Sequence, residues 1–155
     1  MRRLDAIARM IRNETPRPVR GIPVPVSFAK ITVGREYSRN ALADLWGYSS
    51  YHAIARGVVT PRNGSQIILF VTEEKQESLE QYADRLDADI LHWEGPNDHF
   101  AEERMVNAAG SGEQIHLFYR VRHHMDFTYM GRAAVVSHDS RIRQPSQFTL
   151  KLLNE

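Results

Sequence analysis

The stretch EQIHLFYRVRHHMDFTYMGRAAVVSH, residues 113–138, contains two apolar runs separated by the mostly polar segment 121–126. Both runs contain the β-branched and aromatic residues that favour strands, and the segment between them is typical of a turn. We therefore predict a β-hairpin. On its second strand, Phe127 and Tyr129 lie two positions apart, so their side chains are expected on the same face.

Other strand-like and helix-like segments surround this hairpin. Strands are predicted in SQIILFVTEEK (65–75), DILHWE (89–94) and SQFTLKLL (146–153), and the segment 47–61 resembles a turn that enters a strand. Short helices are predicted from a Ser38 cap to Leu45, in SLEQYADRL (78–86) and in HFAEERMVNAA (99–109). This pattern indicates an α+β domain built on a curved mixed sheet or a small β-barrel.

The N-terminal region differs from the rest of the chain. Residues 3–13 place Leu4, Ile7 and Ile11 on one face of a short amphipathic helix, and residues 14–26 contain four prolines, which exclude a helix there. We predict a helix and a proline-rich arm over residues 1–27, followed by one domain over residues 28–155, a length typical of a single domain.

Composition excludes several classes of protein. The chain has no cysteine, so it has no disulfide, thiolate metal site or cysteine nucleophile, which fits a reducing compartment. No apolar run approaches the length needed to span a membrane. Charged residues interrupt the N-terminal region where a signal peptide would need an apolar stretch. We expect a cytoplasmic protein.

The net charge of +1 conceals a segregated pattern. Residues 1–40 carry nine basic and three acidic side chains, whereas residues 73–103 carry two basic and eleven acidic ones. Of the 20 basic residues, seventeen are arginine, whose planar guanidinium suits phosphate and base-edge contacts. In a DNA-binding protein the acidic segment is expected to face away from the phosphates.

No catalytic centre or metal site is evident. The chain lacks a nucleophile elbow, a phosphate-binding glycine loop and a histidine-rich metal motif. The neighbours His123 and His124 would point to opposite faces of a strand, and His92 and His99 form only a loose cluster with nearby carboxylates. We therefore predict a binding module without catalytic residues, metal or cofactor.

Aromatic and basic residues instead gather at the predicted strand and turn edges. Tyr48 and Tyr51, followed by His52, flank a glycine turn, and Trp93 ends a strand before a Gly-Pro turn. Rings in such places either fill a core or stack on a flat ligand. A base flipped out of a duplex needs ring stacking, hydrogen bonds to its Watson–Crick edge and cations for the neighbouring phosphates.

A series of short motifs resembles a known family. Along residues 35–153 the chain contains, in order, YSR, a Gly-Val strand, FVT, HW, LFYR and YMG. Their order resembles the C-terminal domain of unknown function of some modification-dependent (Type IV-like) restriction systems. In those systems this domain is joined to a phospholipase-D-type or HNH nuclease, often with a helicase motor.

The resemblance implies an SRA-like member of the PUA superfamily that flips a modified base, typically 5-methylcytosine or 5-hydroxymethylcytosine, into an aromatic pocket. By motif position it assigns Trp93 and Tyr129 to that pocket and Tyr37, Arg39 and Arg120 to the nucleic-acid face. The family often continues the His-Trp motif with Gln-Ser-Gln, where this chain has Glu-Gly-Pro, so Glu94 or a backbone group is the candidate for reading a base edge.

The full prediction combines these assignments with the aromatic residues at the turns. The predicted base pocket consists of Trp93, Tyr129, Phe127, Tyr48, Tyr51, Glu94 and His92. The predicted contacts to the DNA backbone are Tyr37, Arg39, Arg120, Arg122 and His52.

The expected partners are double-stranded DNA carrying a modified base and a nuclease or helicase domain, in the same chain or a separate one. Two alternatives remain open from the sequence. One is a PUA/YTH-like reader of N6-methyladenine in DNA or RNA. The other is a protein-interaction module that uses the proline-rich arm.

Overall fold

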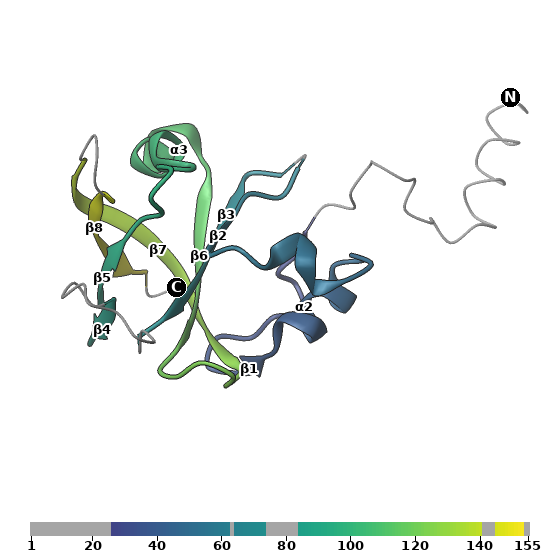
Figure 1. The fold of residues 1–155 in the computed structure, drawn as a ribbon. Coiled ribbons are helices and arrows are strands. Elements are labelled where there is room, and N and C mark those ends of the chain that lie inside the picture. The colour runs from purple at the N-terminus through teal and green to yellow at the C-terminus, as the bar shows by residue number, and fades with distance from the viewer. Residues whose placement is uncertain (1–25, 63, 74–83, 141–144, 154–155) are drawn as a thin grey trace, which may run out of the picture.

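The computed structural model describes residues 26–62, 64–73, 84–140 and 145–153. One twisted sheet runs through this part of the chain, with short helices on both sides of its central strands (Figure 1). Its strands are β1 (Glu36–Tyr37), β2 (Val58–Val59), β3 (Gln66–Thr72), β4 (Arg85–Asp87), β5 (Ile90–Glu94), β6 (Gln114–Arg120), β7 (Phe127–Asp139) and β8 (Gln147–Leu152). Its helices are α2 (Arg39–Leu45), the 3-10 helix η1 (Tyr51–Ile54), α3 (Glu102–Val106) and α4 (Ala108–Ser111).

The predicted hairpin forms the centre of the sheet. Strands β6 and β7 pair antiparallel, and the strand order is β2-β3-β6-β7-β8-β5-β4, with β1 pairing to the start of β7. Strands β3 and β6 are parallel, which makes the sheet mixed. The β6–β7 pairing shifts register between Leu117 and Phe118, opposite Gly131, whose positive φ of 93° is a conformation that glycine adopts without strain.

The central strands are buried on both faces, which explains why their sequences are apolar runs without strict alternation. In β3, Ile67, Leu69 and Val71 belong to one core cluster, and Ile68 and Phe70 belong to the other. The pleat sends successive side chains to opposite faces, so one continuous run of apolar residues supplies both cores.

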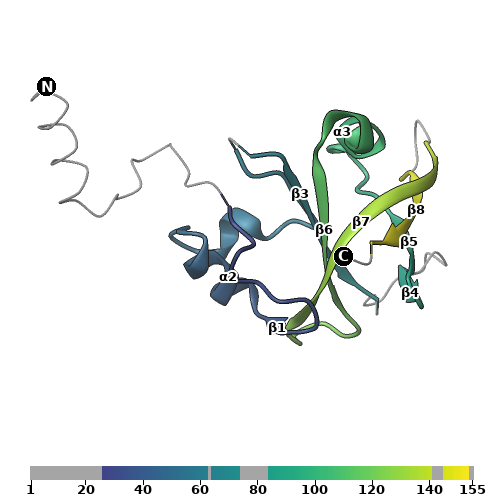
Figure 2. The same cartoon turned by 180° about the vertical axis from the view of Figure 1, so that it is seen from behind.

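Each core is closed by different elements. The first cluster is covered by α3 and α4, through Met105 and Ala108, and by side chains of β5 and β8. The second is covered by α2, η1 and residues 26–31, which include Val26 and Ile31. Seen from both sides, α2 and β5 lie on opposite sides of the central strands (Figures 1 and 2).

Most predicted elements are confirmed. The helix capped by Ser38, the strands at 65–75, 89–94 and 146–153, and a helical segment within 99–109, here split into α3 and α4, are all present. The helix predicted for 78–86 is wrong at its end, because Arg85 and Leu86 pair with β5 as part of β4. The remainder of that segment and the predicted helix at 3–13 lie outside the described residues.

The segment just before α2 packs tightly onto the domain. The Trp46 indole N–H donates to the Ser27 carbonyl oxygen at 2.9 Å, and the Phe28 ring stacks on the His116 ring at a centroid distance of 3.7 Å. Val26 and Ser27, which the sequence prediction assigned to the arm, therefore contact the second core cluster of the domain. In the described part of the chain, no helix is long and apolar enough to cross a membrane.

Candidate functional site

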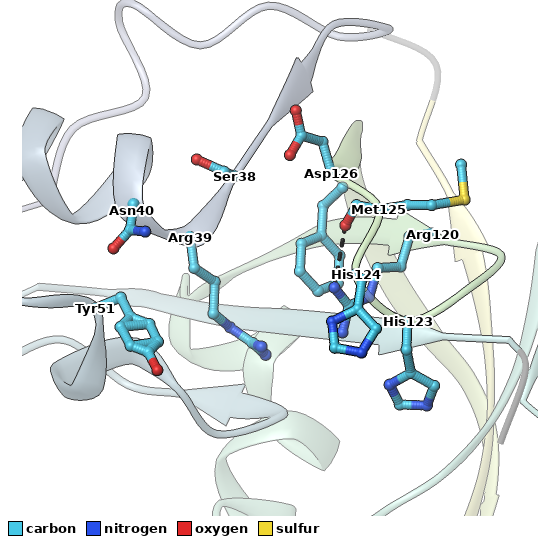
Figure 3. A pocket seen from close by; sticks show the side chains of 10 residues that line it. Ser38, Arg39, Asn40, Tyr51, Arg120, His123, His124, Met125 and Asp126 are labelled. Carbon is cyan, nitrogen blue, oxygen red and sulfur yellow. Dashed lines mark hydrogen bonds between the residues drawn. The ribbon is translucent and has the colours of Figure 1, made fainter. Parts of the chain in front are cut away.

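A pocket of about 360 Å³ opens between α2, η1 and the β6–β7 connection (Figure 3). Figure 3 shows the residues of α2 and η1 on one side and those of the β6–β7 connection on the other. Its lining residues come from segments far apart in the sequence: Ser38, Arg39, Asn40, Tyr51, Arg120, His123, His124, Met125, Asp126 and Phe127.

The first turn of α2 positions one wall of this pocket. Ser38 has an extended backbone, with φ −85° and ψ 161°, and its side chain accepts a hydrogen bond from the Ala41 N–H at 3.0 Å. A serine in this N-cap position satisfies a backbone donor that the helix itself leaves unpaired. The helix therefore begins at Arg39, whose side chain lies against the pocket floor.

Replacing Ser38 by alanine is expected to lower the free energy of unfolding by about 1 kcal/mol, because the cap is lost. Chemical denaturation measures this change. The Ser38→Asp variant is the matched control, since aspartate caps a helix as well as serine does. An unchanged stability in Ser38→Ala would show that the cap does not hold α2 in place.

Arg39 is a desolvated cation on an aromatic floor. Its guanidinium carbon lies 4.6 Å from the centroid of the Phe70 ring and 5.0 Å from that of Phe127. One of its terminal N–H groups donates to the Arg56 carbonyl oxygen at 3.4 Å, while its buried Nε has no partner among the described residues. Burial, and next the charge of Arg120, lower the pKa of Arg39 to about 10.

Arg120, at the end of β6, stacks on the same ring. Its guanidinium carbon lies 4.2 Å from the Phe127 centroid. Its Nε donates to Thr72 Oγ1 at 2.8 Å. One terminal nitrogen donates to the Met125 carbonyl oxygen at 3.0 Å, the bond drawn in Figure 3. Burial lowers the pKa of Arg120. These bonds hold the guanidinium in place and leave its second terminal nitrogen without a bond to the described residues.

Two neighbouring cations here lack a counter-charge. Within residues 26–62, 64–73, 84–140 and 145–153, neither Arg39 nor Arg120 forms an ion pair with a carboxylate. Asp126 is the acidic member of the lining, and it is exposed. Burial disfavours the charged form of both arginines, and the charge of Arg120 further disfavours that of Arg39. An anion or an acceptor-rich group that enters the pocket would compensate these effects.

The β6–β7 connection forms the opposite wall and contains local strain. His124 has a φ of 70°, which is unfavourable for a residue with a side chain. Beside it, Met125 is 49% exposed and Val121 is 47% exposed, high values for apolar residues. Strained backbone in an exposed turn is frequently found at binding sites.

The structure brings several predicted site residues together. Arg39, Arg120, Phe127 and Tyr51 all line the pocket. Phe127 is buried and forms its floor beneath both guanidiniums, whereas Tyr51 is 38% exposed.

Three more predicted residues adjoin the pocket without lining it. Arg122 is exposed in the β6–β7 connection, and the exposed His52 ring lies 4.4 Å from the Tyr51 ring. Tyr37 precedes the Ser38 cap and pairs with Phe127 across β1 and β7, and its hydroxyl accepts from the Thr32 N–H at 2.8 Å.

The β5 residues lie elsewhere. Trp93 is 4% exposed and packs against Phe148 within the first core cluster, with a centroid distance of 5.4 Å. His92, on the opposite face of the strand, has its Nε2 3.9 Å from Asp87 Oδ2. The Glu94 backbone N–H donates to the buried Asp84. None of the three β5 residues lines the pocket described above.

Tyr129 and Tyr48 also lie outside the pocket lining. Tyr129 is 5% exposed in the second core cluster, and its hydroxyl contacts His116 Nδ1 at 2.7 Å. Tyr48 packs against the same cluster, and partial burial raises its pKa.

Six lining residues were not predicted from the sequence: Ser38, Asn40, His123, His124, Met125 and Asp126. In the sequence, the adjacent His123 and His124 bear only on a possible metal site, and the described residues contain no group of three potential ligands close enough to hold a metal ion. The residues from His123 to Asp126 could have been predicted from the turn at 121–126, because its polar residues lie directly between the predicted contacts Arg120 and Phe127.

Comparisons with known proteins identify the fold. A family model, Domain of unknown function (DUF3427), matches residues 31–154. Among curated proteins, none matches the sequence.

Several solved structures are similar to this chain, and three of them are described here. The SUVH5 SRA domain in complex with hemi-methylated CG DNA has a TM-score of 0.58 and 14% identity, over 85% of this chain and 95% of that one. The same domain with methylated CHH DNA has a TM-score of 0.56, at the same identity and coverage. The DNA modification-dependent restriction endonuclease AspBHI has a TM-score of 0.51 and 16% identity, over 79% of this chain and 73% of that one. At these identities the similarity concerns the fold, and it confirms the predicted SRA-like α+β architecture.

Proposed function

The chain belongs to the DUF3427 family, a domain of unknown function, and from its pocket we propose that it is a non-catalytic module that binds DNA carrying a C5-modified cytosine. The observation that carries this proposal is the pairing of Arg39 and Arg120 over one aromatic ring, in a pocket that Tyr51 borders. A flat ligand bearing hydrogen-bond acceptors matches both the ring and the cations.

The lining residues supply what a flipped base requires. Tyr51 offers an exposed ring on which the base stacks. Asp126 offers a carboxylate to accept a hydrogen bond from the exocyclic amine of cytosine, which is the usual partner for that group. We assign the contacts to the flanking phosphates to Arg122 and His52, both of which are exposed beside the pocket.

The similar structures support this proposal through what they bind. The SUVH5 SRA domain is in complex with hemi-methylated CG DNA and with methylated CHH DNA, and AspBHI is a modification-dependent endonuclease. We propose that this chain likewise recognises modified DNA and that a nuclease or helicase domain acts with it, in the same chain or a separate one. Of the acidic segment 73–103, none of the described residues lines the pocket.

Binding to matched duplexes that carry cytosine or a C5-modified cytosine at one position tests the proposal. We expect at least a tenfold preference for a modified duplex, about 1.4 kcal/mol, at one stated salt concentration. Tyr51→Ala is expected to weaken binding of the preferred duplex about fivefold or more, because stacking on one ring contributes about 1–3 kcal/mol.

Tyr51→Phe is the matched control, since it keeps the stacking ring and removes only the hydroxyl. Equal, salt-sensitive binding to all duplexes would reduce the protein to a general phosphate binder and contradict the proposal. Tighter binding to single-stranded RNA, or to DNA containing N6-methyladenine, would favour the alternative class of reader.

A further inference from the structure

We propose that the pocket selects cytosines whose C5 substituent carries oxygen acceptors, with a carboxylate bound most tightly, over cytosines that carry a methyl group. This inference rests on the proposed function, since it assumes that a modified base enters the pocket. It goes beyond that function by naming the chemical class of the modification.

The floor of the pocket offers hydrogen-bond donors in excess of acceptors. A guanidinium has five N–H donors and no acceptor. Arg39 uses one of its donors in a long bond to the Arg56 carbonyl, and its Nε is without a partner in the described part of the chain. Arg120 uses two donors, to Thr72 and Met125, and has others left over.

Contact with the ring leaves terminal N–H donors open to a ligand, whereas the Nε of Arg39 is buried. Both guanidinium carbons lie within 5.0 Å of the centroid of the Phe127 ring. A guanidinium that rests on a ring by its face still presents its N–H groups along its edge, in the fork geometry that matches a carboxylate. The ring therefore supplies apolar contact to the arginines without occupying their hydrogen-bonding positions.

A methyl group fits this floor poorly. Placed against the two guanidiniums, it would displace water from their N–H groups and offer no hydrogen bond in exchange, so each of these donors would be left unsatisfied at a cost in binding. A hydroxymethyl group offers these N–H groups one acceptor oxygen. A carboxylate returns two oxygens and a negative charge that compensates the repulsion between Arg39 and Arg120.

Among the described residues of the lining, no acid pairs with these cations. Asp126 is its acidic residue, and it forms no ion pair with Arg39 or Arg120. Asp126 is exposed, whereas both arginines are partly buried against Phe127. This separation suits a base that offers an amine on one edge and an acidic substituent on another.

The experiment measures equilibrium binding to four duplexes that differ at one cytosine: unmodified, 5-methyl, 5-hydroxymethyl and 5-carboxyl. We expect the 5-carboxyl duplex to bind at least tenfold more tightly than the 5-methyl duplex, with the 5-hydroxymethyl duplex between them. Arg39→Gln and Arg120→Gln are each expected to remove the 5-carboxyl preference.

Matched variants separate this preference from general binding to phosphates. Arg122→Gln, on the same connection but outside the pocket lining, should weaken all four duplexes by one common factor and keep their order. Arg35→Gln, at an exposed position before α2, should change neither the affinity for the four duplexes nor their order. Thermal unfolding checks that each variant folds. Should Arg39→Gln not fold, Arg120→Lys tests the same loss of the 5-carboxyl preference, because lysine keeps the charge and lacks the forked N–H groups of the guanidinium.

Each contrary outcome has a distinct meaning. A preference for the 5-methyl duplex overturns this inference and leaves the proposed function standing. Equal binding to all four duplexes overturns both. A 5-carboxyl preference that survives in both arginine variants overturns the inference as well, because the substituent would then be recognised outside the pocket.

Discussion

Replacing Trp93 by alanine is expected to lower the free energy of unfolding by about 3–5 kcal/mol, as for other large aromatic side chains deleted from a core. Trp93 is 4% exposed and contacts Phe148 in a cluster that also includes Leu91, Leu150 and Met105. Alanine would leave a cavity between β5, β8 and α3 that these side chains cannot fill. Such a loss is a large part of the stability of an ordinary domain.

Denaturant unfolding measures the effect, with Trp93→Phe as the matched control because it retains most of the buried ring. Under conditions where Trp93→Ala remains folded, it should keep the preference of the wild-type protein among modified duplexes, since Trp93 does not line the pocket. A variant of unchanged stability that loses this preference would restore the sequence-based hypothesis that Trp93 is a wall of the base pocket.

Acidification from pH 7.5 to pH 5 is expected to remove about 2 kcal/mol of stability through His116 alone. Burial, and next the charge of Arg132, lower the pKa of His116 from its ordinary value of 6.5 to about 4. Between these values the unfolded chain binds a proton that the folded protein does not. Stability is therefore complete above pH 6.5 and declines as the pH falls towards 4, below which the loss levels off.

The geometry explains why the folded protein keeps this imidazole neutral. His116 Nε2 lies 3.1 Å from the Gln114 amide oxygen, an acceptor, so Nε2 carries the hydrogen. Nδ1 then accepts from the Tyr129 hydroxyl at 2.7 Å. Protonation of Nδ1 would remove that acceptor in a buried site where the Phe28 ring stacks on the imidazole.

Thermal and denaturant unfolding at several pH values measure this effect. His116→Asn should be less stable at pH 7.5 and should lose about 2 kcal/mol less on acidification than the wild type. Tyr129→Phe is a second test, because removing the hydroxyl donor should move the His116 pKa towards its ordinary value and weaken the pH dependence. The same acid sensitivity in wild type and His116→Asn would assign it to other groups.

Structural features that are set by residues close together in the sequence could be predicted from it. The strands β3 and β6 follow from runs of apolar residues that are buried on both faces, and the hairpin follows from a polar segment between two such runs. The start of α2 follows from Ser38, because a cap acts within three residues. Arg39 and Arg120, derived from short motifs, lie in one pocket.

The tertiary structure decided which aromatic residues are accessible. A ring on a strand can face either a core or a ligand, and the outcome depends on which elements cover that face of the sheet. Trp93 lies beneath α3 and beside β8, Tyr129 is covered by the segment containing Phe28, and Tyr51 remains partly exposed on η1. The sequence around each ring does not contain this information.

The type and approximate bounds of most described elements, the mixed α+β class and the two arginines of the pocket could thus be predicted from the amino-acid sequence. The parallel pairing of β3 with β6 and the position of α2 opposite the β6–β7 connection, with the floor of the pocket between them, became evident only from the three-dimensional fold. Capping, turns and strand periodicity act between residues close in sequence, whereas a pocket and a core form between segments dozens of residues apart.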